Sequence, residues 1–153
     1  MNKLKIGSGD WVVVCDGRKA LILENKGDEQ FPNLRMHEVR EHDDAPTHSQ
    51  GADVPGRVHQ SLNADRSAIE QTDWHDIAER HFLLELVRHL DSVLTSHLVK
   101  RFILVASPRA LGMLRSAYSP ALRHAISVEI DKDWVRLPIY EIEEKLLSPE
   151  AAG

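Results

Sequence analysis

The stretch Arg101–Arg115, RFILVASPRALGMLR, joins a strand to a helix almost without a loop. Its first half, RFILVAS, is a short continuous apolar run, which is typical of a strand in the centre of a sheet. Ser107 can cap the following helix, and Pro108 suits the first helical position because that position needs no N–H. We therefore predict a buried strand that runs directly into a helix, as in α/β folds.

The start of this helix is a candidate anion site. Free backbone amides at a helix N-terminus, with Arg109 in the first turn, can bind a negatively charged group. The alternative is that Arg109 is solvated, since every helix start has this geometry. Gly112 costs about 1 kcal/mol relative to Ala in a helix interior. We therefore expect Gly112 to pack closely against a neighbour.

Two apolar runs, Trp11–Cys15 and Ala20–Leu23, precede this unit and are joined through Asp16-Gly17. Asp-Gly between such runs predicts a two-residue β-hairpin in which the glycine takes a positive φ. The nearly continuous Val and Leu indicate strands that are covered on both faces. Residues 33–40, NLRMHEVR, alternate less clearly and predict a third strand near a sheet edge.

A long amphipathic helix is expected after Thr72 or Asp73, either of which can cap it. At 100° per residue, one broad arc of this helix is apolar and the opposite arc is polar. The apolar arc contains Leu83, Leu86, Val87, Leu90, Val93, Leu94 and Leu98. The polar arc contains His81, Glu85, Arg88, His89, Ser92 and Ser96. The pattern predicts a helix that lies on the sheet.

The C-terminal part completes the fold. Residues 124–131, HAISVEID, predict a fifth strand, and residues 137–147, LPIYEIEEKLL, predict a closing helix with Pro138 at its start. The order β-β-β-loop-α-β-α-β-α predicts an α/β fold, a single domain with a five-stranded mixed sheet flanked by helices. We place this domain at residues 10–147, between tails at residues 1–9 and 148–153.

Composition narrows the class of protein. The chain has 153 residues, 17.3 kDa and a formal net charge of −5, which argues against a general nucleic-acid coat but allows a local basic patch. The single cysteine, Cys15, closes an apolar run and is expected in the core, as suits a reducing compartment. The sequence has no apolar stretch of signal-peptide or membrane-spanning length. We expect a cytoplasmic protein that does not cross a membrane.

The segment before the long helix, residues 47–72, is unusually long for a connection in a compact domain. Its centre, residues 48–61, reads HSQGADVPGRVHQS and holds little that could be buried. A flexible linker is one interpretation, and a functional loop is the other. The candidate loop residues are Gln50, Gly51, Pro55, Gly56 and Arg57, of which the arginine can contact phosphate.

Nine histidines raise the question of a metal site. His81, Glu85 and His89 follow each other at intervals of four residues on the polar arc, where neighbours meet. The first and last are about 12 Å apart along the helix, so one ion cannot reach all three without a further element. Residues 37–44, HEVREHDD, are a second charged cluster. Solvated surface is the better interpretation of both, and we predict neither a metal nor a cofactor.

Several blocks together resemble the bacterial family of host attachment proteins. They are VVVCDGRKALILE, PGR, HFLLELVRHLDSVL, RFILVASPRALGMLR and EIDKDWVRLPIYEIEEKL, in matching order from about Asp10 to Leu147. The family is in turn similar to the middle domain of archaeo-eukaryotic peptide-chain release factors and of Pelota ribosome-rescue proteins. That resemblance implies an RNase H-like topology and a loop, after the third strand, that reaches the ribosome.

The release-factor resemblance has a limit at the loop. Release factors carry Gly-Gly-Gln there, whereas this chain has Ser49-Gln50-Gly51. The resemblance therefore implies an accessory domain that associates with the ribosome or with rRNA or tRNA and that affects host attachment indirectly. The residues expected to contact RNA are Arg57, Arg109, Ser107 and Arg115.

Two other classes of function stay open. One is a hydrolase of peptidyl-tRNA or a related substrate, in which Gln50 orients water and His48 or His59 acts as base. The other is a protein-interaction module that forms a homodimer by strand pairing along residues 33–40.

Overall fold

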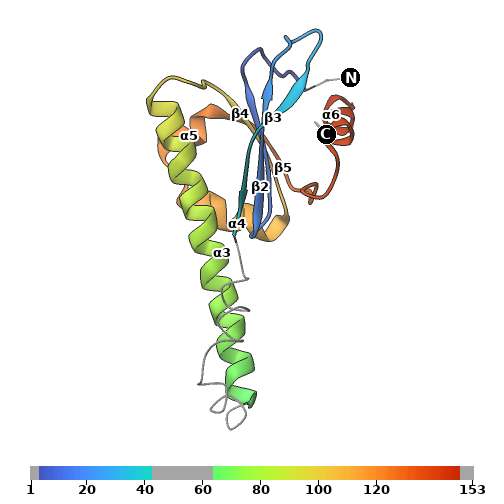
Figure 1. Ribbon diagram of the computed structural model, residues 1–153. Coiled ribbons are helices and arrows are strands. Elements are labelled where there is room, and N and C mark those ends of the chain that lie inside the picture. Colours follow the sequence, from blue (N-terminus) through green and yellow to red (C-terminus); the bar gives the residue numbers. More distant parts are fainter. Residues whose placement is uncertain (1–3, 43–63, 149–153) are drawn as a thin grey trace.

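The computed structural model describes residues 4–42 and 64–148, and for residues 64–73 the backbone alone. Its strands are β1 (Trp11–Cys15), β2 (Lys19–Asn25), β3 (Leu34–Glu41), β4 (Phe102–Ala106) and β5 (Ile126–Ile130). Its helices are α3 (Ala64–Thr95), α4 (Pro108–Ala117), α5 (Pro120–Ala125) and α6 (Ile139–Leu147). The predicted class, a single α/β domain with a five-stranded mixed sheet and flanking helices, is confirmed (Figure 1).

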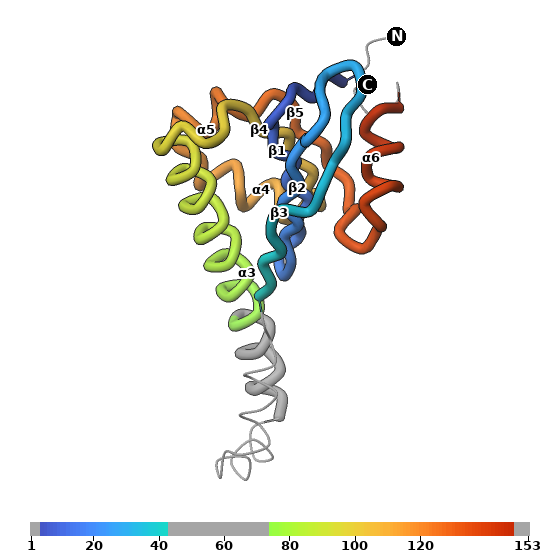
Figure 2. The backbone as a smooth tube through the Cα atoms, turned by 45° about the horizontal axis from the view of Figure 1, so that its top comes forward, coloured from blue at the N-terminus to red at the C-terminus, as the bar shows by residue number. Residues whose placement is uncertain are grey.

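The strand order is β3-β2-β1-β4-β5, with β1 antiparallel to β2 and parallel to β4. Helices α3, α4 and α5 lie on one face of the sheet and α6 lies on the other (Figure 2). Side chains of β1 and β4 alternate between the two resulting cores, and every one of them is buried. Coverage of both faces explains why these strands are apolar throughout.

Cys15 lies in the core on the α3 side, as the sequence predicted. Burial, with a smaller contribution from the Asp16 carboxylate, raises the pKa of its thiol far above the ordinary value. The thiol is therefore protonated and chemically inert.

The β1–β2 hairpin forms as predicted, but its turn differs. Strand β1 ends at Cys15 and β2 begins at Lys19, so three residues connect the strands rather than two. The Asp16 carboxylate accepts hydrogen bonds from the backbone N–H groups of Arg18 and Lys19, both at 2.8 Å. Gly17 does not take a positive φ; Gly9 is the glycine with a positive φ in the described part of the chain. The aspartate side chain, not the glycine backbone, shapes the turn.

Strand β3 is an edge strand, as predicted, and carries one extra residue. Leu23 pairs with Met36 and Ile22 with Glu38, so His37 forms a bulge. Bulges and charged side chains are typical of edge strands that resist pairing with another chain. Homodimerisation through β3 stays a prediction.

Helix α3 is longer than predicted. It begins at Ala64, so Thr72 and Asp73 are not caps and the segment 47–72 is helical from residue 64 onward. Residues 64–71, ADRSAIEQ, contain no Pro or Gly and include strong helix formers, so the helix extends upstream of the proposed caps. Residues 47–63 lie outside the described part.

The apolar arc of α3 is buried as predicted except at its end. Leu83, Leu86, Val87, Leu90 and Val93 lie in the core, whereas the side chain of Leu98 is 74% exposed. The helix ends at Thr95, and His97 then takes a positive φ of 64°. The helical period no longer applies beyond this turn.

Two details of the C-terminal half also differ from expectation. A Cβ at Gly112 would meet nothing within 4 Å, so close packing does not explain this glycine. Residues Pro120–Ala125 form a short helix, α5, before the predicted fifth strand, which narrows to Ile126–Ile130. The Ser119 hydroxyl caps α5 by accepting the N–H of Leu122 at 3.0 Å.

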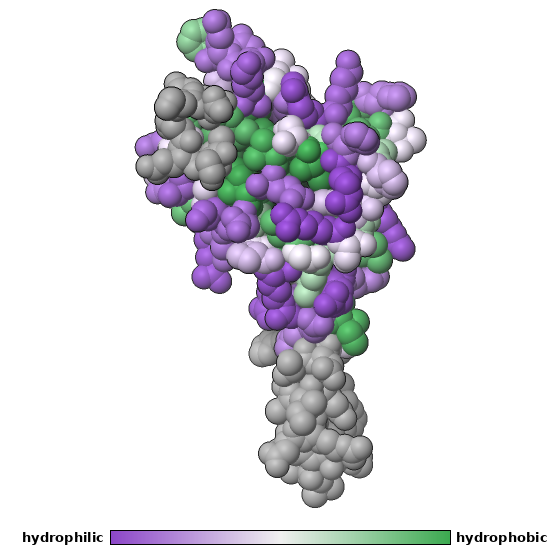
Figure 3. Space-filling model, turned by 180° about the vertical axis from the view of Figure 1, so that it is seen from behind, coloured by the Kyte–Doolittle hydropathy of each residue, from purple (hydrophilic) through white to green (hydrophobic). Residues whose placement is uncertain are grey.

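Seen from the side opposite to Figure 1, the surface is largely hydrophilic, with hydrophobic side chains gathered near its centre (Figure 3). Phe31, Trp74, Ile77 and Tyr140 are large apolar side chains that are more than half exposed. No helix in the described part is long and apolar enough to cross a membrane.

Candidate functional site: a charged cleft at the carboxyl ends of β1 and β4

A cleft of about 280 Å³ lies where the parallel strands β1 and β4 end. The chain leaves β1 toward β2 on one side and leaves β4 toward α4 and β5 on the other. Ligands of open α/β sheets commonly bind where neighbouring strands diverge in this way. The lining residues are Asp16, Gly17, Arg18, Glu79, Ser107, Arg109, Ala110, Met113 and Arg136.

Gly17 permits a close approach between the β1–β2 turn and α3. A Cβ at this position would lie 2.7 Å from Cδ and 2.9 Å from Cγ of Glu79. The missing side chain therefore lets Glu79 line the cleft beside the β1–β2 turn. This is a packing reason for the Asp16-Gly17 pair that the hairpin pattern did not reveal.

The start of α4 forms one wall of the cleft. Pro108 occupies the first turn as predicted, and the N–H of Ser107 donates to the carbonyl of Cys15 at 3.3 Å. The predicted side-chain cap is absent, because the Ser107 hydroxyl accepts no hydrogen bond from the helix. The first turn also contains no acidic residue. The positive end of the helix dipole thus faces the cleft without a capping side chain.

Arg109, the residue predicted to bind an anion, is held by two carboxylates of α3. Its Nη2 pairs with Oδ1 of Asp76, and its Nε lies 3.2 Å from Oε1 of Glu79. The Arg109 side chain is 64% exposed, so it remains accessible at the mouth of the cleft. Arg109 therefore joins α4 to α3 through two ion pairs, a role that the sequence did not suggest.

Arg136 reaches the same cleft from the loop between β5 and α6. Among the residues whose side chains the structure describes, 4–42 and 74–148, no carboxylate lies within ion-pair distance of Arg136, and Arg136 is exposed. No sequence motif marked this arginine. Only the path of the chain after β5 brings it to the ends of β1 and β4.

Arg115, also predicted to contact RNA, does not line the cleft. Its Nε and Nη2 donate to Oε1 of Glu129 at 2.9 and 2.7 Å, and the Tyr118 hydroxyl donates to Oε2 of the same carboxylate at 2.8 Å. Burial and this hydrogen bond raise the pKa of Tyr118 far above its usual range. The arrangement joins α4 to β5, and RNA contact by Arg115 stays a prediction.

The remaining predicted site residues lie outside the described part of the chain. They are the loop residues Gln50, Gly51, Pro55, Gly56 and Arg57 and the candidate bases His48 and His59. Their predicted roles stay predictions.

A family model described as "Protein required for attachment to host cells" matches residues 11–146. The match begins at the first residue of β1 and ends inside α6, so it contains the whole sheet and every residue of the cleft. This chain belongs to the host attachment family. Among curated proteins no match was found. The matching family model says nothing of release factors, so the resemblance to their middle domain stays a hypothesis.

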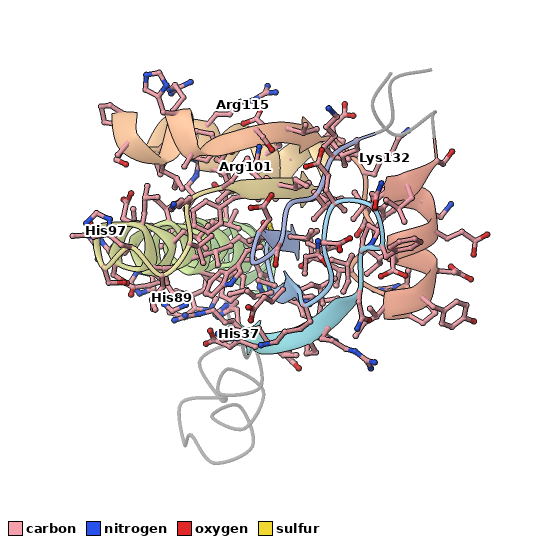
Figure 4. The ribbon with its side chains drawn as sticks, turned by 90° about the horizontal axis from the view of Figure 1, so that it is seen from above. His37, His89, His97, Arg101, Arg115 and Lys132 are labelled. Carbon is pink, nitrogen blue, oxygen red and sulfur yellow. The ribbon has the colours of Figure 1, made fainter. Side chains whose placement is uncertain are left out.

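His89, which the sequence analysis placed on the solvated arc of the long helix, contacts strand β3 instead. His89 turns away from His81 and toward β3, with Nε2 lying 3.2 Å from Oε1 of Glu38. His37 lies beside the Trp11 ring at 4.7 Å between centroids, on the strand next to His89 (Figure 4). Within the described residues, no group of three His, Cys, Asp or Glu side chains could hold a metal ion.

We expect His89 to make the stability of the folded protein depend on pH. Burial, followed by the charge of Arg40, lowers the pKa of His89, and the Glu38 carboxylate only partly opposes this. Below the ordinary histidine pKa of about 6.5, the unfolded chain therefore takes up a proton more readily than the folded protein. Stability is therefore fully present above about pH 6.5. It falls as the pH drops toward the lower pKa that His89 has in the folded protein.

We expect urea unfolding to show this loss between pH 7.5 and pH 5.5, with the pH interval chosen to bracket the usual histidine pKa of about 6.5. The His89→Gln variant, which cannot take up the proton, loses less stability over the same interval than the original protein. Equal losses in the two proteins would show that His89 is not responsible.

Proposed function

We propose that this member of the host attachment family binds RNA at the charged cleft and acts as a cytoplasmic, ribosome-associated accessory domain. In this proposal its part in host attachment is indirect. The observation that carries the proposal is the convergence of three arginines, Arg18, Arg109 and Arg136, from three separate segments. They meet at the uncapped start of α4.

This chemistry suits phosphate. Guanidinium groups donate paired hydrogen bonds to phosphate oxygens, and free amides at a helix start add further donors. The Ser107 hydroxyl, which caps nothing, can also donate. RNA presents repeated phosphates, so even a protein with a net charge of −5 can bind it through a local basic site.

The position of α3 supports a long ligand. Glu79 lies in the cleft, and α3 begins 15 residues earlier, at Ala64. Those residues extend the helix by about 22 Å beyond the cleft. Strand β3 ends at the same edge, since Glu41 pairs with Lys19 next to the β1–β2 turn. Figure 1 shows α3 projecting from the body of the domain at this end.

The test is sedimentation of the tagged protein with ribosomes at about 0.1 M salt, where phosphate contacts persist. We expect co-sedimentation, and we expect the Arg109→Ala/Arg136→Ala double variant to lose most of it. With purified RNA, the slope of log K against log salt concentration should fall by about 1 for each arginine that contacts a phosphate.

Arg88→Ala is the matched control. Arg88 is an exposed arginine on α3, is paired with Glu85 at 3.1 Å, and does not line the cleft. The Arg88→Ala variant should bind ribosomes and RNA like the original protein. Absence of co-sedimentation, or equal binding by the double variant and the control, would overturn the proposal.

A further inference from the structure

Arg109 is 64% exposed, but part of its guanidinium group is already engaged in the structure. Asp76 and Glu79 both engage its guanidinium, and Asp76 also pairs with Arg80 through Oδ2 at 3.2 Å. The Glu79 side chain is only 20% exposed, and the absence of a side chain at Gly17 lets it approach this closely. The two carboxylates therefore occupy the Nε and Nη2 edge of Arg109, an edge through which a guanidinium group can bind phosphate with two hydrogen bonds.

We infer that Asp76 and Glu79 are specificity-determining residues that compete with RNA for Arg109. This inference rests on the proposed function and names the class of ligand more narrowly. The cleft takes a strand with several phosphates and rejects a single anion such as inorganic phosphate.

The reason is the balance of charge in the cleft. A single phosphate that binds the Nε and Nη2 edge of Arg109 must displace two carboxylates, and both displaced groups stay nearby on α3 and repel it. An RNA strand has further phosphates that other arginines of the cleft can hold at the same time. Once one phosphate is bound, the next has a high effective concentration at Arg109 and can displace the carboxylates.

The experiment removes the competing charges and keeps the shapes of the side chains. In the Asp76→Asn/Glu79→Gln variant, we expect measurable binding of inorganic phosphate at low salt, where the original protein shows none. We also expect binding of a single-stranded RNA of about ten nucleotides to strengthen about tenfold. Adding Arg109→Ala to this variant should abolish both gains.

Two controls separate this effect from others. Glu85→Gln/Glu144→Gln removes the same charge from α3 and α6 outside the cleft, and it should change RNA binding much less. Circular dichroism and thermal unfolding report whether a variant is folded. If the double variant does not fold, Glu79→Gln alone is tested with the same two ligands.

The outcomes distinguish the two proposals. If the original protein binds RNA but the cleft variant gains neither ligand, or gains no more than the charge control, the inference is wrong and the proposed function stands. If the original protein binds no RNA, the proposed function fails. An Arg109-dependent gain of phosphate binding then still supports the competition, and its absence overturns the competition as well.

Discussion

The Asn25→Ala variant is expected to lose about 3 kcal/mol of unfolding free energy. Asn25 is 1% exposed and lies at the end of β2. Its Nδ2 donates to the carbonyls of Ile6, Gly7 and Asp28, at 2.9, 3.0 and 3.3 Å. Its Oδ1 accepts the N–H groups of Gly27 and Asn33 at 2.9 and 2.8 Å. Alanine would leave several of these backbone groups without the partner that the buried Asn25 side chain supplies.

The measurement is urea unfolding followed by circular dichroism, with Asn33→Ala as the control. Asn33 lies in the same hairpin but is exposed, and its N–H bond to Asn25 does not involve its side chain. The control should stay within about 0.5 kcal/mol of the original protein. If Asn25→Ala were equally mild, water would have to replace the lost partners and the hairpin would not depend on this side chain.

The Leu90→Ala variant is expected to lose about 3 kcal/mol, within the range of 2–5 kcal/mol seen for large-to-small changes in cores. Leu90 is 1% exposed and belongs to the core between α3 and the sheet. Removing its side chain leaves a cavity, because the helix is held on both sides by Leu86 and Val93 and cannot close the gap. The same unfolding experiment measures the loss.

Leu98→Ala is the control for this variant, because helical spacing predicts that Leu90 and Leu98 share one face of the helix. Leu98 follows the end of α3 and is 74% exposed, so its truncation should change stability by less than about 0.5 kcal/mol. A large loss at Leu98 would mean that this side chain is covered in solution, for example by another chain.

The candidate site was only partly visible in the sequence. The strand-to-helix join at Ser107 and Pro108 marked the start of α4, and it does line the cleft. Its partners were not predictable, because Glu79 and Arg136 are far away along the chain and carry no motif. The interpretation of Arg109 as either solvated or anion-binding missed a third possibility, an ion pair with another helix.

The sequence by itself determined the order of the elements, apart from the short helix α5, and the burial of the central strands β1 and β4 on both faces. Trp11–Cys15 and Phe102–Ala106 are apolar at every position, and such strands are stable only when both faces are covered. The Asp-Gly turn and the Ser-Pro helix start depend on a few neighbouring residues, so both could be located from the sequence. The tertiary structure alone decided that Leu98 is exposed and which charges meet in the cleft. These features depend on which distant segments lie side by side, and the spacing of residues along the chain does not contain that information.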